Sequence, residues 1–270
     1  MNKPWLAHYP EGMPAELGHI PYESLSDLLE EAFERYAERT AFRFMGASLT
    51  YRELEQQSRS FAAYLQGLGL QPGDRVALMM PNVFQYPVAV AGVVRAGLVV
   101  VNTNPLYTPR ELEHQLKDSG ARAIVILENM AHTLEACRAA VPTLQHVVVT
   151  GVGDMLPRLK GTIVNFVLRH VKRAVPRYDL PGSLRWREAI AQGAAKRVAP
   201  VKRRLEDPAL LQYTGGTTGT AKGATLSHRN IVSNVLQSEL WNEPATRLVP
   251  SNEQVVTVCA LPLYHIFALT

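Results

Sequence analysis

The sequence contains the stretch Tyr213-Thr-Gly-Gly-Thr-Thr-Gly-Thr-Ala-Lys-Gly223, which follows the apolar run Ala209-Leu-Leu211. The stretch includes four glycines, four threonines and one lysine. Glycine lets backbone N–H groups approach an anion because no side chain stands in the way. Threonine adds hydroxyl donors, and lysine adds a compact positive charge. The composition therefore favours a loop that binds a phosphate chain over an ordinary glycine-rich surface turn.

This loop differs from two common nucleotide-binding patterns. A Walker sequence ends in Gly-Lys-Ser or Gly-Lys-Thr, whereas Lys222 lies between Ala221 and Gly223, and the loop is not a dinucleotide fingerprint either. It closely resembles the phosphate-binding core motif of the adenylate-forming superfamily, which includes acyl-CoA synthetases, peptide-synthetase adenylation domains and luciferase-like enzymes. Members of that family usually have Ser or Thr at the position of Gly215, and often Pro at the position of Ala221.

Further segments resemble the other core motifs of the superfamily, in the expected order. They are Leu49-Thr-Tyr-Arg-Glu-Leu54 for the first motif, Arg95-Ala-Gly-Leu-Val-Val-Val-Asn-Thr-Asn-Pro105 for the second and Leu261-Pro-Leu-Tyr-His-Ile-Phe267 for the fourth. Family members continue well beyond the fourth motif. The resemblance implies that this continuation supplies an acidic residue near the metal, a ribose-binding Asp and a mobile C-terminal domain with a catalytic Lys.

The resemblance also implies the site residues. The nucleotide site comprises Tyr213, Thr214, Gly215, Gly216, Thr217, Thr218, Gly219, Thr220, Lys222 and Gly223. Tyr264 and His265 are implied beside the acyl carbonyl and the adenylate, with His265 as the catalytic residue that orients the reactants; the alternative is an ordinary core tyrosine and histidine. Mg²⁺ is implied as a cofactor, but no metal ligand is assigned, because Gly215 lacks a hydroxyl. His228 is expected to be structural.

Apolar periodicity predicts alternating helices and strands. We expect helices capped by Ser26 and then at 52–68, 82–96, 108–120, 130–140 and from Ser227 to about Leu240, and strands at 41–45, 49–51, 75–80, 98–101, 121–127, 146–150, 210–213 and 254–260. Strands that are apolar on both faces indicate an α/β fold of layered, mostly parallel sheets covered by helices. The resemblance makes this the incomplete N-terminal half of an adenylate-forming domain.

The expected domain organisation has two parts. A first α/β subdomain covers residues 1–205 and contains a basic insertion at 156–204, and the start of a second subdomain covers 206–270. A chain of 270 residues that is 47% hydrophobic can bury substantial cores. Cys137 and Cys259 have no metal or redox spacing and are expected to be buried. No secretory signal or transmembrane span is expected.

The insertion carries thirteen Lys or Arg residues against Asp179 and Glu188. Its apolar residues recur at helical spacing between Leu156 and Val175, which predicts an amphipathic helix with a cationic flank. Such a helix either lies on an anionic membrane surface or packs its apolar stripe against the body of the protein. Nucleic acid is not expected, because the patch lacks interleaved aromatic residues. The segment 156–173 is similar to one in bacterial long-chain fatty-acid CoA ligases.

The resemblance therefore implies an AMP-forming acid–thiol ligase that acts on long-chain fatty acids. A fatty carboxylate attacks the α-phosphorus of ATP and releases pyrophosphate, and the thiol of coenzyme A then displaces AMP. We expect a cytoplasmic enzyme, peripheral on the inner face of the cytoplasmic membrane, and leave a homodimer open. The alternatives are another adenylate-forming enzyme, of the peptide-synthetase or luciferase-like type, or a catalytically silent nucleotide- or membrane-binding fragment. The isolated chain is expected to be inactive.

Overall fold

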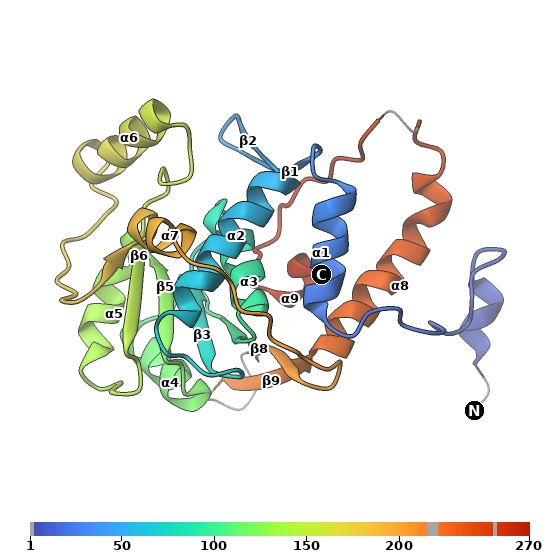
Figure 1. Cartoon of the computed structure of the whole chain (residues 1–270), viewed down its shortest axis with the longest axis horizontal. Helices are drawn as coiled ribbons and strands as arrows, with labels where there is room; N and C mark the ends of the chain where they lie inside the picture. Colours follow the sequence, from blue (N-terminus) through green and yellow to red (C-terminus); the bar gives the residue numbers. More distant parts are fainter. Residues whose placement is uncertain (1–2, 215–220, 251–252) are drawn as a thin grey trace.

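The computed structural model describes residues 3–214, 221–250 and 253–270, which form a layered α/β structure (Figure 1). A seven-stranded sheet has the strand order β7-β6-β5-β3-β4-β8-β9, and β1 and β2 form a separate hairpin. The strands are β1 Thr40–Phe44, β2 Ala47–Thr50, β3 Arg75–Met79, β4 Val99–Asn102, β5 Ala123–Leu127, β6 His146–Thr150, β7 Leu184–Arg185, β8 Pro208–Thr214 and β9 Lys222–Ser227.

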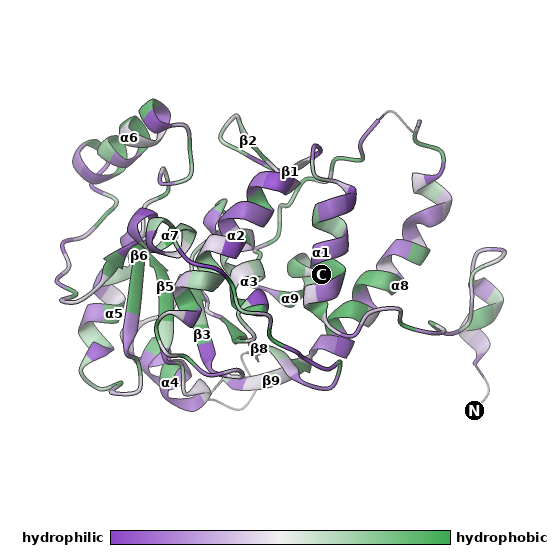
Figure 2. Ribbon diagram, viewed as in Figure 1, coloured by the Kyte–Doolittle hydropathy of each residue, from purple (hydrophilic) through white to green (hydrophobic). Residues whose placement is uncertain are grey.

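The large sheet is parallel from β7 to β8, and only its last pair, β8 with β9, is antiparallel. This confirms the predicted α/β class. Figure 2 shows β5 and β6 mainly in the green of apolar residues, as expected for strands that are covered on both faces. In register, Leu78 of β3 lies beside Asn102 of β4, which lies beside Gln212 of β8.

Helices cover both faces of the sheet. The α-helices are α1 Leu25–Arg35, α2 Tyr51–Gln66, α3 Gln85–Arg95, α4 Pro109–Ser119, α5 Ala131–Arg138, α6 Arg158–Phe166, α7 Trp186–Ala194, α8 His228–Thr246 and α9 Ile266–Leu269, with 3₁₀ helices η1 Pro4–His8 and η2 Glu128–Met130 and a π-helical segment η3 Val167–Val171. Strand residues such as Leu78 and Val100 pack with α1, α2, α3, α7 and α8. Their neighbours Met79 and Val101 pack with α4 and α5.

The direction in which the chain crosses the sheet changes around β3, which has β4 on one side and β5 on the other. The connection from β3 to β4 runs through α3 on one face, and the connection from β4 to β5 runs through α4 on the other. In open parallel sheets, ligands bind outside the carboxyl ends of the strands at such a point. A site is therefore expected at the carboxyl edge of the sheet, close to the end of β3.

Several local predictions are confirmed. Thr108 and Glu111 form a reciprocal capping box at the start of α4, and Gly120 ends that helix in the left-handed region with φ 60°. Strand β6 has the predicted bounds, and Ser227 caps α8 through the backbone N–H of Asn230.

Two local predictions are wrong. The cap of α1 is Ser24, whose hydroxyl accepts from Asp27 N at 3.4 Å, while the hydroxyl of Ser26 donates to the carbonyl of Val94. The segment Gln254–Ala260 forms no strand. Its valines are exposed and it joins no ladder with a described strand, so β-branched residues alone do not make a strand there.

The division into two subdomains at residue 205 stays a prediction. Strands β8 and β9, which lie after that boundary, extend the same sheet as β3 to β7. Helix α8, which follows them, contributes Ile231 and Val232 to the core on the α3 face.

The predicted amphipathic helix of the basic insertion is present as α6 and η3, which lie at one end of the molecule (Figure 1). Leu159, Ile163 and Phe166 have exposed fractions of 77%, 53% and 57%, so they face solvent. Contacts with the body include Arg169 of η3, which pairs with the buried carboxylate of Glu128 at 2.5 Å. Arg185 of β7 pairs with the same carboxylate at 3.1 Å.

Candidate functional site

The second, third and fourth motif segments meet at the carboxyl ends of β3, β4 and β8. Asn102 ends β4 beside Gln212, which lies two residues before the end of β8. Asn82, just after β3, holds the chain that leads into the fourth motif. Its side-chain amide donates to the carbonyl of Leu261 at 2.9 Å and accepts from Leu263 N at 2.8 Å. The structure therefore brings together three segments that are distant in sequence, at the point where the topology predicts a ligand.

The predicted phosphate loop, Tyr213–Gly223, contains the connection between β8 and β9. Thr214 and Lys222 are paired across the two strands, and both are exposed. The loop residues Gly215, Gly216, Thr217, Thr218, Gly219 and Thr220 lie outside the described residues, so their contact with phosphate stays a prediction. The hairpin nevertheless fixes where that loop begins and ends.

Strand alternation sorts the hairpin side chains between the two faces of the sheet. Thr214 and Lys222 lie on the same face as Leu210, which is the face covered by α3 and α8. The fourth motif packs on this face too, through Leu263 and Tyr264. A hydroxyl and an ammonium group therefore flank the loop on the side of the sheet that also carries the fourth motif.

Tyr213 and Gly223 lie on the opposite face, toward α4. They are paired across the hairpin, and a Cβ on Gly223 would lie 2.9 Å from the ring of Tyr213, so the ring occupies the space that a side chain would need. The hydroxyl of Tyr213 donates to Asp118 of α4 at 2.5 Å. Burial, followed by the contact with Asp118, raises the pKa of Tyr213, so the phenol stays protonated.

A buried chain of hydrogen-bonded side chains links α3 to β4 and β8, on the face of the sheet that carries Thr214 and Lys222. The hydroxyl of Tyr86 donates to the side chain of Asn102 at 2.7 Å, and Asn102 donates in turn to the side chain of Gln212 at 2.9 Å. Burial raises the pKa of Tyr86, which keeps this donor in place. Asn102 belongs to the second motif, so that motif contributes a fixed link between α3 and β8.

The fourth motif borders a groove of about 1240 Å³. This exceeds the roughly 300–1,000 Å³ that is usual for small-molecule sites. The groove is lined mainly by apolar side chains from β1, from the start of α3 and from the chain on either side of Tyr264 and His265, including Phe42, Phe44, Val83, Phe84, Leu263, Phe267 and Leu269. Such a lining suits an apolar ligand.

Tyr264 and His265 differ in their surroundings. Tyr264 is half-buried against the core, whereas His265 is exposed and caps the short helix α9, accepting from Phe267 N at 3.4 Å. Neither residue is a fully buried core residue. Their implied roles beside the adenylate stay predictions.

Residues of the first and second motifs also stabilise the fold. Thr50 and Glu53 of the first motif form the capping box of α2. Arg95 of the second motif is buried, pairs with Glu30 and Glu55 at 2.6 and 3.2 Å, and lies over the ring of Phe33.

The two cysteines differ from each other. Cys137 is buried as predicted, but Cys259 is exposed and contacts Asn82, so the prediction for Cys259 is wrong. In residues 3–214, 221–250 and 253–270, no three His, Cys, Asp or Glu side chains gather in a way that could hold a metal ion.

Comparison with known proteins agrees with this arrangement. The sequence model of the AMP-binding enzyme family matches residues 29–270. The long-chain-fatty-acid–CoA ligases of Salmonella typhimurium and Yersinia pestis are 55% and 56% identical to this chain, over 271 and 274 residues. The alignments cover 100% of this chain and 47% of each relative, so the chain spans about half the length of the curated relatives it matches.

Solved structures show the same fold. The long-chain-fatty-acid-CoA ligase FadD1 from Archaeoglobus fulgidus superposes with a TM-score of 0.69 at 25% identity, covering 97% of this chain and 46% of that one. MbtA from Mycobacterium smegmatis gives 0.69 at 27% identity, covering 93% and 41%. In the part of this chain that the structure describes, no helix has both the length and the apolar character of a membrane span.

Proposed function

Because the chain belongs to the AMP-binding enzyme family, we propose that the complete protein is an AMP-forming long-chain fatty-acid CoA ligase. The observation that carries this proposal is the identity of 55% to long-chain-fatty-acid–CoA ligases over the whole chain. The substrates are ATP, a fatty acid and coenzyme A. The second candidate is the activity of another adenylate-forming enzyme, since such enzymes share this fold.

The residues at the sheet edge support the first half-reaction. When the fatty carboxylate attacks the α-phosphorus, negative charge builds on the departing pyrophosphate. Lys222 and Thr214 flank the loop on one face, where an ammonium and a hydroxyl stabilise that charge. Enzymes accelerate phosphoryl-group transfer mainly by positioning the reactants and stabilising charge electrostatically. Fixed hydrogen-bond donors can provide this stabilisation, and no nucleophile from the protein is needed.

The apolar groove beside the fourth motif suits the acyl chain. Its apolar walls favour hydrocarbon over water, by about 0.8 kcal/mol for each buried methylene. His265 and Tyr264 lie in the segment that borders this groove, so the carboxylate end of the fatty acid belongs next to them. His265 then orients the carboxylate or the adenylate by hydrogen bonding.

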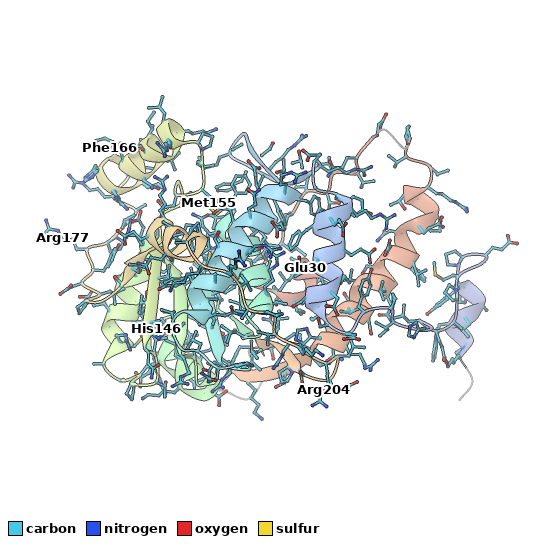
Figure 3. All side chains as sticks on the ribbon, in the orientation of Figure 1. Glu30, His146, Met155, Phe166, Arg177 and Arg204 are labelled. Atoms are coloured by element: carbon cyan, nitrogen blue, oxygen red, sulfur yellow. The ribbon has the colours of Figure 1, made fainter. Side chains whose placement is uncertain are left out.

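We also propose that α6 and η3 hold the complete protein on an anionic membrane surface, at the inner face of the cytoplasmic membrane. Leu159, Ile163 and Phe166 are exposed together on α6, and Lys172 and Arg173 follow η3 on the surface. Figure 3 labels Phe166 on α6 and Arg177 on the segment beyond η3, both at the same end of the molecule. Apolar insertion combined with cation attraction is the usual basis of such binding.

Pyrophosphate release by the complete protein tests the enzymatic proposal. The protein is supplied with ATP and with acetate, an amino acid, an aryl acid or a long-chain fatty acid in turn. We expect release above background only with the fatty acid, followed by thioester formation when coenzyme A is added. A preference for the amino acid or the aryl acid would assign the protein to another branch of the family.

A further inference from the structure

We infer that α4 acts as a clamp on the phosphate loop, with His114 and Asp118 as positioning residues for the first half-reaction. The inference rests on the proposed function of the loop. His114 Nε2 lies 3.0 Å from the carbonyl oxygen of Ala221, which is the residue just before β9. Asp118 accepts the hydroxyl of Tyr213, which lies near the end of β8. One helix therefore holds both stems of the loop.

The spacing on α4 makes this possible. His114 and Asp118 are four residues apart, so their side chains project from the same face of the helix. Between them Gln115, which is buried, donates to the carbonyl of Asn102 at 2.9 Å and ties α4 to the end of β4. The capping box at Thr108 and the left-handed Gly120 define both ends of the helix. The clamp is thus built on a rigid element.

The contact with Tyr213 reaches both strands of the hairpin. Asp118 fixes the phenol, and the ring of Tyr213 lies against Gly223, which follows Lys222 directly. Holding the ring therefore holds the backbone next to Lys222. A larger residue at position 223 would displace the ring, so glycine is required there for packing.

The clamp and the reacting groups lie on opposite faces of the sheet. Thr214 and Lys222 face α3 and α8, whereas Tyr213 packs with α4. His114 and Asp118 thus act on phosphate only through the backbone of the hairpin. By holding Ala221 and Tyr213, they preorganise the stem backbone beside Lys222 and Thr214, and preorganisation lowers the cost of binding.

The test separates the two half-reactions of the complete protein. We expect the double variant His114→Ala with Asp118→Ala to raise the KM for ATP and to slow acyl-adenylate formation at least tenfold. The reaction of preformed acyl-adenylate with coenzyme A should stay within twofold of wild type, because pyrophosphate has already left. The conservative pair His114→Gln with Asp118→Asn keeps a donor and an acceptor, and should restore adenylation to within about threefold.

Two comparisons make the result decisive. Glu113 and Lys117 pair with each other on α4 at 2.6 Å, so Glu113→Gln with Lys117→Gln is a matched change on the same helix and should leave both half-reactions unaltered. Lys222→Ala tests the loop itself. If Lys222→Ala leaves adenylation unchanged, the proposed function of the loop is wrong, and the clamp with it. If Lys222→Ala slows adenylation but the double Ala variant does not, or slows both half-reactions equally, only the clamp is wrong.

Discussion

His228 illustrates how one buried side chain couples two distant parts of this chain. It is 1% exposed and directly follows the cap of α8. Its Nδ1 accepts the backbone N–H of Leu25, at the start of α1, at 3.0 Å. Burial, and then the positive charge of Arg203, lower the pKa of His228 to about 4. The imidazole is therefore neutral at pH 7, and the prediction that His228 is structural is confirmed.

This lowered pKa predicts that acid destabilises the fold. The pKa of His228 is about 4 in the folded chain and about 6.5 in the unfolded chain, so the unfolded state binds more protons between these values. The free energy of unfolding then falls as the pH falls through that interval, by about 2 kcal/mol from pH 7 to pH 5 for this residue. Urea unfolding of the chain at both pH values measures the loss.

A variant isolates the contribution of His228 from that of other groups. The pKa of His146 is also lowered, mainly by burial, so part of the acid sensitivity has another source. In His228→Asn the amide oxygen still accepts from Leu25 N but does not titrate. We expect the loss between pH 7 and pH 5 to be about 2 kcal/mol smaller in this variant. An equal loss in both proteins would assign the acid sensitivity elsewhere.

The candidate site residues divide into those that local sequence suggests and those that it does not. Thr214 and Lys222 can be proposed from the sequence because their motif is contiguous. Asp118 and Asn82 are not, because each acts on a segment far away in sequence, at separations of 95 and 179 residues. The hydrogen-bond partner of such a residue depends on strand order, and local periodicity carries no information about strand order.

Among the elements, prediction succeeded where the stabilising contacts are local. The capping boxes of α2 and α4 need only residues three positions apart, and strand β6 is a short apolar run with clear ends. The segment Gln254–Ala260 has the composition of a strand but lacks a strand partner among the described residues. A strand is completed by its neighbour, so composition alone overpredicted it.

The α6–η3 element allows a direct test of membrane binding. The choice of residues matters because Arg169 is paired with Glu128, and Lys160 contacts the carbonyl of Met45. Changing either would disturb the fold as well as the charge. We therefore expect Arg158→Gln, Lys172→Gln and Arg173→Gln together to weaken sedimentation of the complete protein with anionic vesicles, each charge contributing on the order of 1 kcal/mol.

The control removes the same charge from another part of the insertion. Lys196→Gln, Arg197→Gln and Lys202→Gln change three exposed residues away from α6 and should have a smaller effect. Binding by the wild type should also fall between 0.1 M and 1 M salt, since the Debye length shrinks from about 10 Å to about 3 Å. Equal losses in the two triple variants would mean that the helix is not the membrane contact. Equal binding to neutral vesicles would exclude cation attraction as its basis.

For the whole molecule, sheet order explains why widely spaced motifs act together. Strands β3, β4 and β8 are neighbours although their sequences span residues 75–214, and their carboxyl ends share one edge. The second motif ends one of these strands, the loop leaves another, and Asn82 beyond the third holds the approach to the fourth motif. The first motif instead serves as a helix cap.

The last prediction concerns this chain taken alone. It covers 47% of each of its Salmonella and Yersinia relatives. The family resemblance places the ribose-binding Asp and the catalytic Lys after the fourth motif. We therefore expect the 270-residue chain to form no detectable acyl-adenylate from labelled fatty acid and ATP in a single-turnover assay, at a concentration where the complete protein reacts fully.

The control is a cooperative urea unfolding transition of the isolated chain, which shows that the chain is folded. An unfolded chain would form no adenylate, whatever residues it contains. Detectable adenylate formation by the folded chain would contradict the prediction. In that case the loop stems, the groove and the fourth motif would contain every group that the first half-reaction needs. Silence of the folded chain would instead mean that these parts supply a partial site, in which Lys222 and His265 require partners from the remainder of the family domain.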